Sequence, residues 1–426
     1  MVRHVKNDLN INFSNIINNL HKNYGIEHLS HYHASLNELA KMLHNHPDID
    51  VLKIHFARYC VMLGYEQQAC ALIDSIGDNV RDLNILQCKA WAHHFKGEDD
   101  KARSLWDFTE KYLFSGSTES NAKGVRLVQP NKLNEISDAD SILHFSCCRN
   151  EIDKLPFFLE HYRKLGVDLF FIVDNHSTDG TFEFLKTQKD VCLFSCSDSF
   201  KGSGFGMAWI NKLIRCYAKN NWVVHSDIDE LLIYADCENK DLRALTKEMD
   251  GQGEKLMRGF ALDMYPCNLN DLKLNANVPP YYQHNYFYNN YLYLGGIYPP
   301  YNQVRGGVFS VLLNGDYTVL NKTPLFKANS NIRLLNSSHI ITPPYPFSLS
   351  KQTCVLMHFK LTDGLMTRVQ EEMQRKQHAC NSKLYKGYLG FLHKTNRNFD
   401  PDIHTYSTQY KDSKQLVELG IIQAGY

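Results

Sequence analysis

Asp227 and Asp229 are the two residues whose type and spacing point most directly to chemistry. They follow the apolar run 222–224, which predicts a buried strand. Side chains two positions apart on extended backbone point the same way, so the two carboxylates can reach one point. Carboxylates bind hard divalent cations such as Mg²⁺ and Mn²⁺, which in turn hold the phosphate oxygens of a ligand. A lone Asp-x-Asp pair is often a solvated turn, and its place after a strand is what favours a metal site.

Polar residues also follow two earlier predicted strands. Arg149 and Glu151 come after the first strand, and Asp174 lies at the tip of the second. The segment 174–181 is rich in residues typical of turns and helix caps, which is its alternative interpretation. Because ligands of open α/β sheets bind beyond the carboxyl ends of the strands, we expect these three residues beside the two aspartates.

The elements that position these residues alternate between strand and helix. Strands are expected at 142–147, 169–173, 191–194 and 222–224, and helices at 153–165, 181–186 and 206–219. This alternation predicts an α/β domain with a mostly parallel central sheet and helices on both faces. Residues 260–345 lack the alternation and predict long loops with a few mixed strands. A further helix is expected at 365–390, and its segment 368–378 is typical of a solvated amphipathic face.

Residues 1–114 are expected to form an all-α domain. Five positions there recur with the same residue at a spacing near one tetratricopeptide unit, roughly 34 residues. They are Ala57, Gly64, Ala69, Leu72 and Asp74, then Ala90, Gly97, Ala102, Leu105 and Asp107. The region resembles tetratricopeptide helical hairpins, with an unrelated helical bundle as the alternative. We expect a linker at 115–139, the α/β domain at 140–395 and a tail at 396–426.

Composition narrows the possible classes of protein. Lys+Arg and Asp+Glu both number 46, so no overall charge favours nucleic acid as a partner. The 12 cysteines are scattered and form no C-x-x-C pair, which argues against a zinc site and favours reduced thiols in the cytoplasm. Without an apolar leader or a run of about 20 apolar residues, we expect no secretion signal and no transmembrane segment. A peripheral location at the inner face of the membrane is compatible with these features.

In this order and spacing, residues 141–235 resemble the GT-A class of nucleotide-sugar glycosyltransferases, in its family-2-like branch related to family 92. The matching segments are 148–151, 171–181, Trp209 and 222–231. The resemblance implies a GT-A fold, a nucleotide-diphosphate sugar donor such as a UDP-sugar, and an inverting reaction. It also implies that Arg149, Glu151 and Asp174 lie near the nucleoside, and that Asp227 and Asp229 lie at the ribose and at a bound Mn²⁺ or Mg²⁺.

Fragments after residue 235 look like C-terminal landmarks of the same family. They are the segments 305–309, 322–327, 336–339 and 357–360. Arg305 and Lys327 could clamp phosphates, with ordinary surface charges as the alternative. His358 or His339 could complete the metal shell through a neutral imidazole, and His358 follows the apolar run 354–357, so we expect it at a strand end.

An inverting transfer needs a general base beside the acceptor hydroxyl. We expect Asp263 in this role, with Glu230 or a histidine as alternatives, and a turn or helix cap as the other use of Asp263. The tyrosines of residues 281–301 suit stacking on sugars, or packing in a β-rich region.

These residues predict a metal-dependent glycosyltransferase acting on a hydroxyl of a glycan or lipid-linked acceptor, in the synthesis of cell-surface polysaccharide. The helical repeats would dock a protein partner. An inactive GT-A-like scaffold that binds a protein is the alternative. A nucleotidyltransferase would carry a glycine-rich phosphate loop after the first strand, and residues 147–151 contain no glycine.

Overall fold

The computed structural model describes residues 141–267 without a break and, with gaps, residues 39–108, 122–136, 272–375, 387–393 and 406–424. The chain divides into two compact units. One comprises Met1–Leu113 and Asn290–Gly306, and the other comprises Phe114–Asn289 and Gly307–Tyr426. Among the helices within the described residues, none has the length and apolar character that crossing a membrane requires.

The first unit is helical in the described part of residues 39–108, where α4 (Glu66–Asp74) is its longest complete helix. Its core gathers small and branched residues, namely Ile54, Ala57, Cys70, Ile73, Ile76 and Ala92. Ala90 and Ala102, two of the recurring positions, are fully buried, as close helix packing requires. Gly64 and Asp107 lie outside the described residues, and the repeat itself stays a prediction.

The first unit also contains a segment from outside residues 1–114, which the sequence had assigned to the α/β domain. Residues of the segment 290–306 form β9 (Tyr291–Leu294) and β10 (Gln303–Gly306), which pair antiparallel as a two-stranded sheet. Aromatic and β-branched residues favour extended backbone, which is the local reason for this pair.

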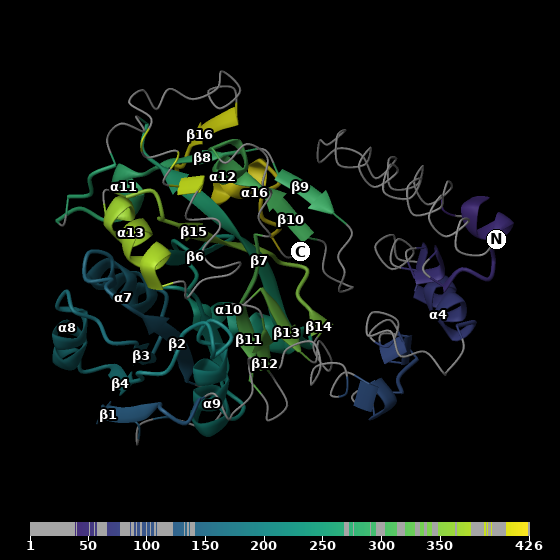
Figure 1. Ribbon diagram of the computed structural model, residues 1–426, viewed down its shortest axis with the longest axis horizontal. Helices are drawn as coiled ribbons and strands as arrows, with labels where there is room; N and C mark the ends of the chain where they lie inside the picture. Colours follow the sequence, from purple (N-terminus) through teal and green to yellow (C-terminus); the bar gives the residue numbers. More distant parts are fainter. Residues whose placement is uncertain are drawn as a thin grey trace. The chain divides into compact units, whose positions relative to one another are not determined.

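The second unit is built on a 12-stranded sheet (Figure 1). Its strands are β1 (Arg126–Pro130), β2 (Ile142–Cys148), β3 (Leu169–Asp174), β4 (Val191–Ser195), β5 (Trp222–His225), β6 (Glu230–Tyr234), β7 (Glu254–Tyr265), β8 (Tyr286–Tyr288), β11 (Asn321–Lys327), β14 (Ser348–Leu349), β15 (Cys354–His358) and β16 (Ser407–Gln409). The central path runs β1-β4-β3-β2-β5-β11-β7-β15-β6. A separate pair joins β12 (Arg333–Leu335) to β13 (Ile340–Thr342). The α/β class is confirmed.

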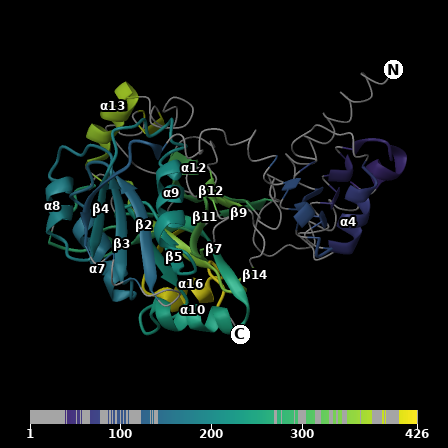
Figure 2. The ribbon, with the colours of Figure 1, turned by 90° about the horizontal axis from the view of Figure 1, so that it is seen from below.

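Within the described residues of this unit, the helices are α7 (Leu155–Lys164), α8 (Thr181–Thr187), α9 (Met207–Tyr217), α10 (Leu242–Gly251), α11 (Pro280–Gln283), α12 (Gly307–Leu312), α13 (Leu365–Arg375) and α16 (Ser413–Glu418). In Figure 2, α7 and α8 lie on one side of the strands β4, β3 and β2, and α9 lies on the other. Right-handed crossovers explain this, since the chain steps from β2 to β3 to β4 and then returns to β5 beside β2. The strand order reverses between β2 and β5, and the carboxyl side of such a reversal is where open α/β sheets bind ligands.

The other half of the sheet is mixed, so the expectation of a mostly parallel sheet is wrong there. β11 runs antiparallel to both of its neighbours, β5 and β7, whereas β15 is parallel to β7 and antiparallel to β6. Only four residues separate β5 from β6, too few for the crossover that a parallel strand needs, so β6 runs back in the opposite direction.

Two segments that were expected outside the α/β domain contribute to its sheet. β1, within the predicted linker 115–139, pairs antiparallel with the edge strand β4. β16, within the predicted tail 396–426, pairs with β8. Ser413 at the start of α16 accepts a backbone hydrogen bond from Asp236 and donates to Glu238. Composition alone did not predict these strands, because each is short and is formed by pairing with a strand that is distant in the sequence.

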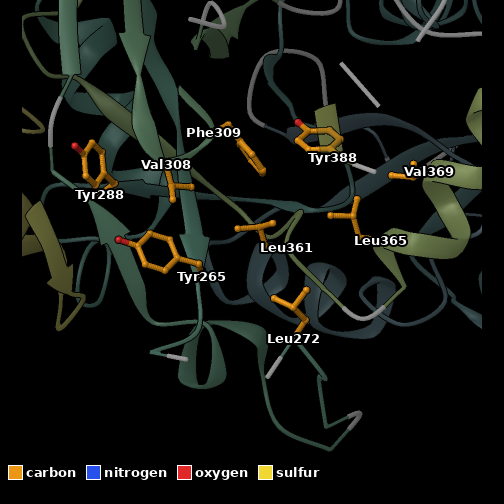
Figure 3. Packing of buried hydrophobic residues seen from close by; sticks show 9 residues of the cluster. All are labelled: Tyr265, Leu272, Tyr288, Val308, Phe309, Leu361, Leu365, Val369 and Tyr388. Atoms are coloured by element: carbon orange, nitrogen blue, oxygen red, sulfur yellow. The ribbon is translucent and has the colours of Figure 1, made fainter. Parts of the chain in front are cut away.

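A buried cluster next to β7 supports α12 and α13. Figure 3 shows Leu361, Leu365 and Val369 in one cluster with aromatic rings from four other segments. The full set is Tyr265, Leu272, Tyr288, Val308, Phe309, Leu361, Leu365, Val369 and Tyr388. Leu365 and Val369 are four residues apart, so both fall on one face of α13, and that face anchors the helix.

Candidate active site

Several charged side chains meet at one edge of the large sheet. Since β11 is antiparallel to both β5 and β7, and β15 is parallel to β7, the carboxyl ends of β5, β7 and β15 share this edge with the starts of β6 and β11. We refer to it as the carboxyl edge. Its charged residues from these strands and turns are Asp227, Asp229, Glu230, Asp263, Lys322 and His358.

Three of these residues form a row across neighbouring strands. His358 on β15 lies opposite Glu230 of β6 on one side and opposite Asp263 of β7 on the other. Directly paired residues share a face of the sheet, so the row brings an imidazole next to two carboxyl groups. The backbone N–H of Phe359 donates to the carbonyl of Asp229 at 2.8 Å, which fixes the Asp227–Asp229 turn against β15.

His358 lies between two carboxylates at different distances. Its Nδ1–H donates to Asp263 Oδ1 at 2.7 Å, whereas its Nε2 lies 3.6 Å from Asp229 Oδ2, too far for a hydrogen bond. Two atoms that each bind one ion at about 2.1 Å are about 3.0–3.6 Å apart for angles of about 90–120°. Asp229 and His358 therefore fit as a pair of metal ligands, with Asp263 orienting the imidazole from behind as second carboxylates do in metal sites.

The pKa values of this pair reflect its charges. Burial raises the pKa of Asp229, but the neighbouring His358 outweighs burial and holds that pKa well below its ordinary value. Burial lowers the pKa of His358, yet Asp229 and Asp263 together raise it to about 10. Each group thus stabilises the charged form of the other.

Lys322 forms the second centre of the carboxyl edge. Its ammonium donates to Glu230 Oε1 at 2.8 Å and to Asp227 Oδ2 at 3.2 Å, and its side chain is only 6% exposed. Burial raises the pKa of Glu230, whereas the ammonium of Lys322 outweighs burial at Asp227 and lowers the pKa there. The backbone N–H of Asp227 donates to Glu230 Oε2 at 3.1 Å. Both oxygens of Glu230 are thus engaged, so this residue positions Asp227 and Lys322 and is a poor general base.

Lys327, which the sequence suggested as a phosphate clamp, lies at the other end of β11. It pairs with Trp222, the first residue of β5, whereas Asp227 follows the last. At about 3.3 Å per residue, five residues of strand separate it from the carboxyl edge by roughly 16 Å. Its ammonium binds Asp250 at 2.7 Å and lies 5.8 Å from the centroid of the Trp222 ring. The structure does not bring Lys327 to the site.

Arg149 and Asp174, expected near a nucleoside, hold the loops at the ends of β2 and β3. Arg149 donates to Glu371 at 3.1 and 3.2 Å and to the carbonyls of Asn175 and His176 at 2.8 and 2.6 Å. Most of its N–H groups are therefore engaged by the protein. Asp174 is buried and accepts the backbone N–H of Ser177 at 3.1 Å, which closes the turn after β3.

Glu151 joins the site through two cations. Its Oε2 accepts from Lys154 at 2.8 Å and from Arg368 of α13 at 3.1 Å. Arg368 Nη1 also lies 4.0 Å from Asp229 Oδ2. The sequence had placed Arg368 on a solvated face, and the local pattern held no signal for this contact because Arg368 is 217 positions from Glu151.

The two other residues suggested for the site have different positions. His339 is half-buried, its Nδ1 lies 2.7 Å from the carbonyl of Asn321, and desolvation beside Lys322 lowers its pKa to about 4. It is therefore neutral near pH 7. Arg305 lies in β10, which belongs to the first unit, and its role as a phosphate clamp stays a prediction. The segment 336–338 lies outside the described residues.

Within the part of the chain that the structure describes, no three His, Cys, Asp or Glu side chains are grouped so that they could hold a metal ion. A cation bound by Asp229 and His358 would need ligand oxygens from a substrate, as Mg²⁺ commonly has. No protein-family model matches the chain, and no curated protein is significantly similar to it.

Proposed function

We propose that the chain is a metal-dependent, inverting glycosyltransferase of GT-A type, which moves a sugar from a nucleotide-diphosphate donor to a hydroxyl of a glycan or lipid-linked acceptor. The observation that carries the proposal is the arrangement of Asp229 and His358, 3.6 Å apart, with Asp263 bound behind the imidazole. The position of this pair near the reversal of strand order between β2 and β5 also supports it.

Asp229 and His358 would hold Mn²⁺ or Mg²⁺. Such a cation would offset the negative charge that develops on the leaving diphosphate. His358 would bind it through Nε2, because Asp263 accepts the proton on Nδ1. With a pKa of about 10 the imidazole is protonated near pH 7 without metal, so the cation would displace the proton from Nε2. Lys322 keeps Asp227 ionised and in place, and Glu230 keeps Lys322 in place.

Asp263 is our candidate for the general base. It is 2% exposed, and its Oδ2 has no hydrogen-bond partner within the described residues. A buried oxygen without a donor is unfavourable by about 1–3 kcal/mol, and the hydroxyl of an acceptor would supply that donor. A carboxylate hydrogen-bonded to the attacking hydroxyl takes up its proton as the new bond forms.

The acceptor and the partner follow from the resemblance and from the first unit. Synthesis of cell-surface polysaccharide, on a glycan or lipid-linked acceptor at the inner membrane face, fits a sequence without an apolar span. The helical part of the first unit would dock a protein partner, through the surface that tetratricopeptide-like hairpins present.

The test is hydrolysis and transfer from a panel of nucleotide sugars, with Mn²⁺, with Mg²⁺ and with chelator. We expect one donor to be consumed only with metal, and consumption to fall at least about 100-fold in Asp229→Asn, because the ligand pair is broken. Asp250→Asn, which removes a carboxylate near the opposite end of β11, is the matched control and should keep full activity. Metal-independent consumption, or equal activity in both variants, would overturn the proposal.

A further inference from the structure

The geometry points to Arg368 of α13 as the residue that binds the diphosphate of the donor, an inference that rests on the proposed function. Arg368 lies between two carboxylates of the site, with Nη2 3.1 Å from Glu151 Oε2 and Nη1 4.0 Å from Asp229 Oδ2. Nothing in the local sequence marked it, since its neighbours on the helix are typical of a solvated face.

Asp229 Oδ2 is the point on which this arrangement centres. His358 Nε2 lies 3.6 Å from it and Arg368 Nη1 lies 4.0 Å from it, and neither distance is a hydrogen bond. The imidazole and the guanidinium thus face the same carboxylate oxygen. Phosphate oxygens held at the Asp229–His358 pair would come within reach of Arg368.

The charges around Glu151 allow Arg368 to turn towards an anion. Glu151 Oε2 is also bound by Lys154 at 2.8 Å, and the side chain of Lys154 is 2% exposed. Moving the guanidinium from Glu151 to a diphosphate would therefore leave Glu151 paired. A buried carboxylate without a cation is strongly unfavourable, and Lys154 removes that obstacle.

The helix that carries Arg368 is held on two sides. Leu365 and Val369 pack in the buried cluster of Figure 3, and Glu371, three residues after Arg368, binds Arg149 at 3.1 Å. Residues three and four apart lie on neighbouring positions of a helix, so the same element places its apolar side in the core and its polar side over the β2 loop. A planar guanidinium on a fixed helix suits bidentate recognition of phosphate.

The experiment measures binding of inorganic pyrophosphate to the full chain by calorimetry, with Mn²⁺ and with chelator. We expect Arg368→Gln to weaken binding about 10-fold or more in both conditions, because a charge-assisted contact is lost. Arg368→Lys keeps the charge but not the fork, and should bind with intermediate affinity. Arg163→Gln is the matched control, since Arg163 binds Asp190 at 2.6 Å just before β4, at the opposite edge.

Unchanged pyrophosphate affinity in Arg368→Gln, or an equal loss in Arg163→Gln, overturns the role of Arg368. If Arg368→Gln does not fold, Arg368→Lys is the test. Wild-type affinity of Arg368→Lys for pyrophosphate, with an unchanged salt dependence, would also overturn the role of Arg368. The donor panel separates this result from the proposed function: metal-dependent consumption of a donor together with unchanged pyrophosphate binding would remove Arg368 alone. Absence of both donor consumption and pyrophosphate binding in the wild type would remove both proposals.

Discussion

The two ends of β11 carry two lysines in opposite surroundings. Lys322 at the carboxyl edge is 6% exposed and shared between two carboxylates, Asp227 and Glu230. Lys327 at the other end is 23% exposed, binds Asp250 and lies over the ring of Trp222. The two lysines are five positions apart on one strand, but their environments differ in burial and in the number of carboxylates that each contacts.

The difference shows which end of the sheet is suited to chemistry. The opposite edge, where β3 and β4 begin, is called the amino edge. Its ion pairs Arg163–Asp190 and Arg243–Asp168 are partly exposed, and their N···O distances of 2.6 and 2.8 Å are those of direct contacts. At the carboxyl edge, Asp229 faces an imidazole at 3.6 Å and a guanidinium at 4.0 Å without closing on either. Exposed ion pairs in direct contact contribute little to the free energy of unfolding. Charged side chains that lie near each other without a direct contact can bind a ligand between them.

The largest expected difference is in stability. Lys322→Met leaves Asp227 and Glu230 without their cation, and we expect it to lower the free energy of unfolding by about 3–5 kcal/mol. Lys327→Met removes a partly exposed pair and should lower it by about 1 kcal/mol or less. Urea unfolding of the two variants measures this. Adding Glu230→Gln to Lys322→Met should recover part of the loss, and equal losses in the two single variants would contradict the comparison.

The next effect is on metal affinity. Asp229→Asn should weaken binding of Mn²⁺ in the presence of pyrophosphate about 10–100-fold, because one of two protein ligands loses its charge. Asp250→Asn should leave it unchanged. Calorimetric titration with Mn²⁺ checks both, and wild-type affinity in Asp229→Asn would remove this carboxylate from the metal site.

A smaller effect concerns pH. His161 on α7 donates to the carbonyl of Leu232 in β6 at 2.9 Å, and burial lowers its pKa to about 4. The unfolded chain takes up a proton on this residue near pH 6.5 and the folded chain does not, so stability is lost as the pH falls from about 6.5 towards 4. His161→Gln keeps a donor for Leu232. As the pH falls through this window, the free energy of unfolding of His161→Gln should decrease less steeply than that of the wild type, by about 1 kcal/mol per pH unit. Urea unfolding at several pH values measures both slopes. A variant whose slope matches the wild type would show that His161 is not the cause.

The smallest effect is expected at the exposed ion pairs of the amino edge. Arg243→Gln breaks the pair with Asp168, both of whose side chains are 40% or more exposed. Such pairs contribute about 0.2–1 kcal/mol, and 0.5 M salt should reduce the difference from wild type further. A loss above about 2 kcal/mol by urea unfolding would mean that the two edges do not differ in the way described.

Much of the α/β half of the site was predictable because it is local. The strands that end at Cys148, Asp174 and His225 are short apolar runs, and polar residues follow each of them directly. The position of His358 at a strand end was confirmed for the same reason. The antiparallel half was not predictable, since its strands are separated by long loops without a regular period.

By itself, the sequence determined that Asp227 and Asp229 follow a buried strand, because burial and alternation are read from neighbouring residues. Only the tertiary structure decided their partners. Asp263 and His358 are 95 positions apart and meet because β7 and β15 are parallel and adjacent. Lys322, and not Lys327, reaches the carboxyl edge because β11 runs antiparallel to β5. The direction and order of strands are set by packing across the whole sheet, and no local pattern contains them.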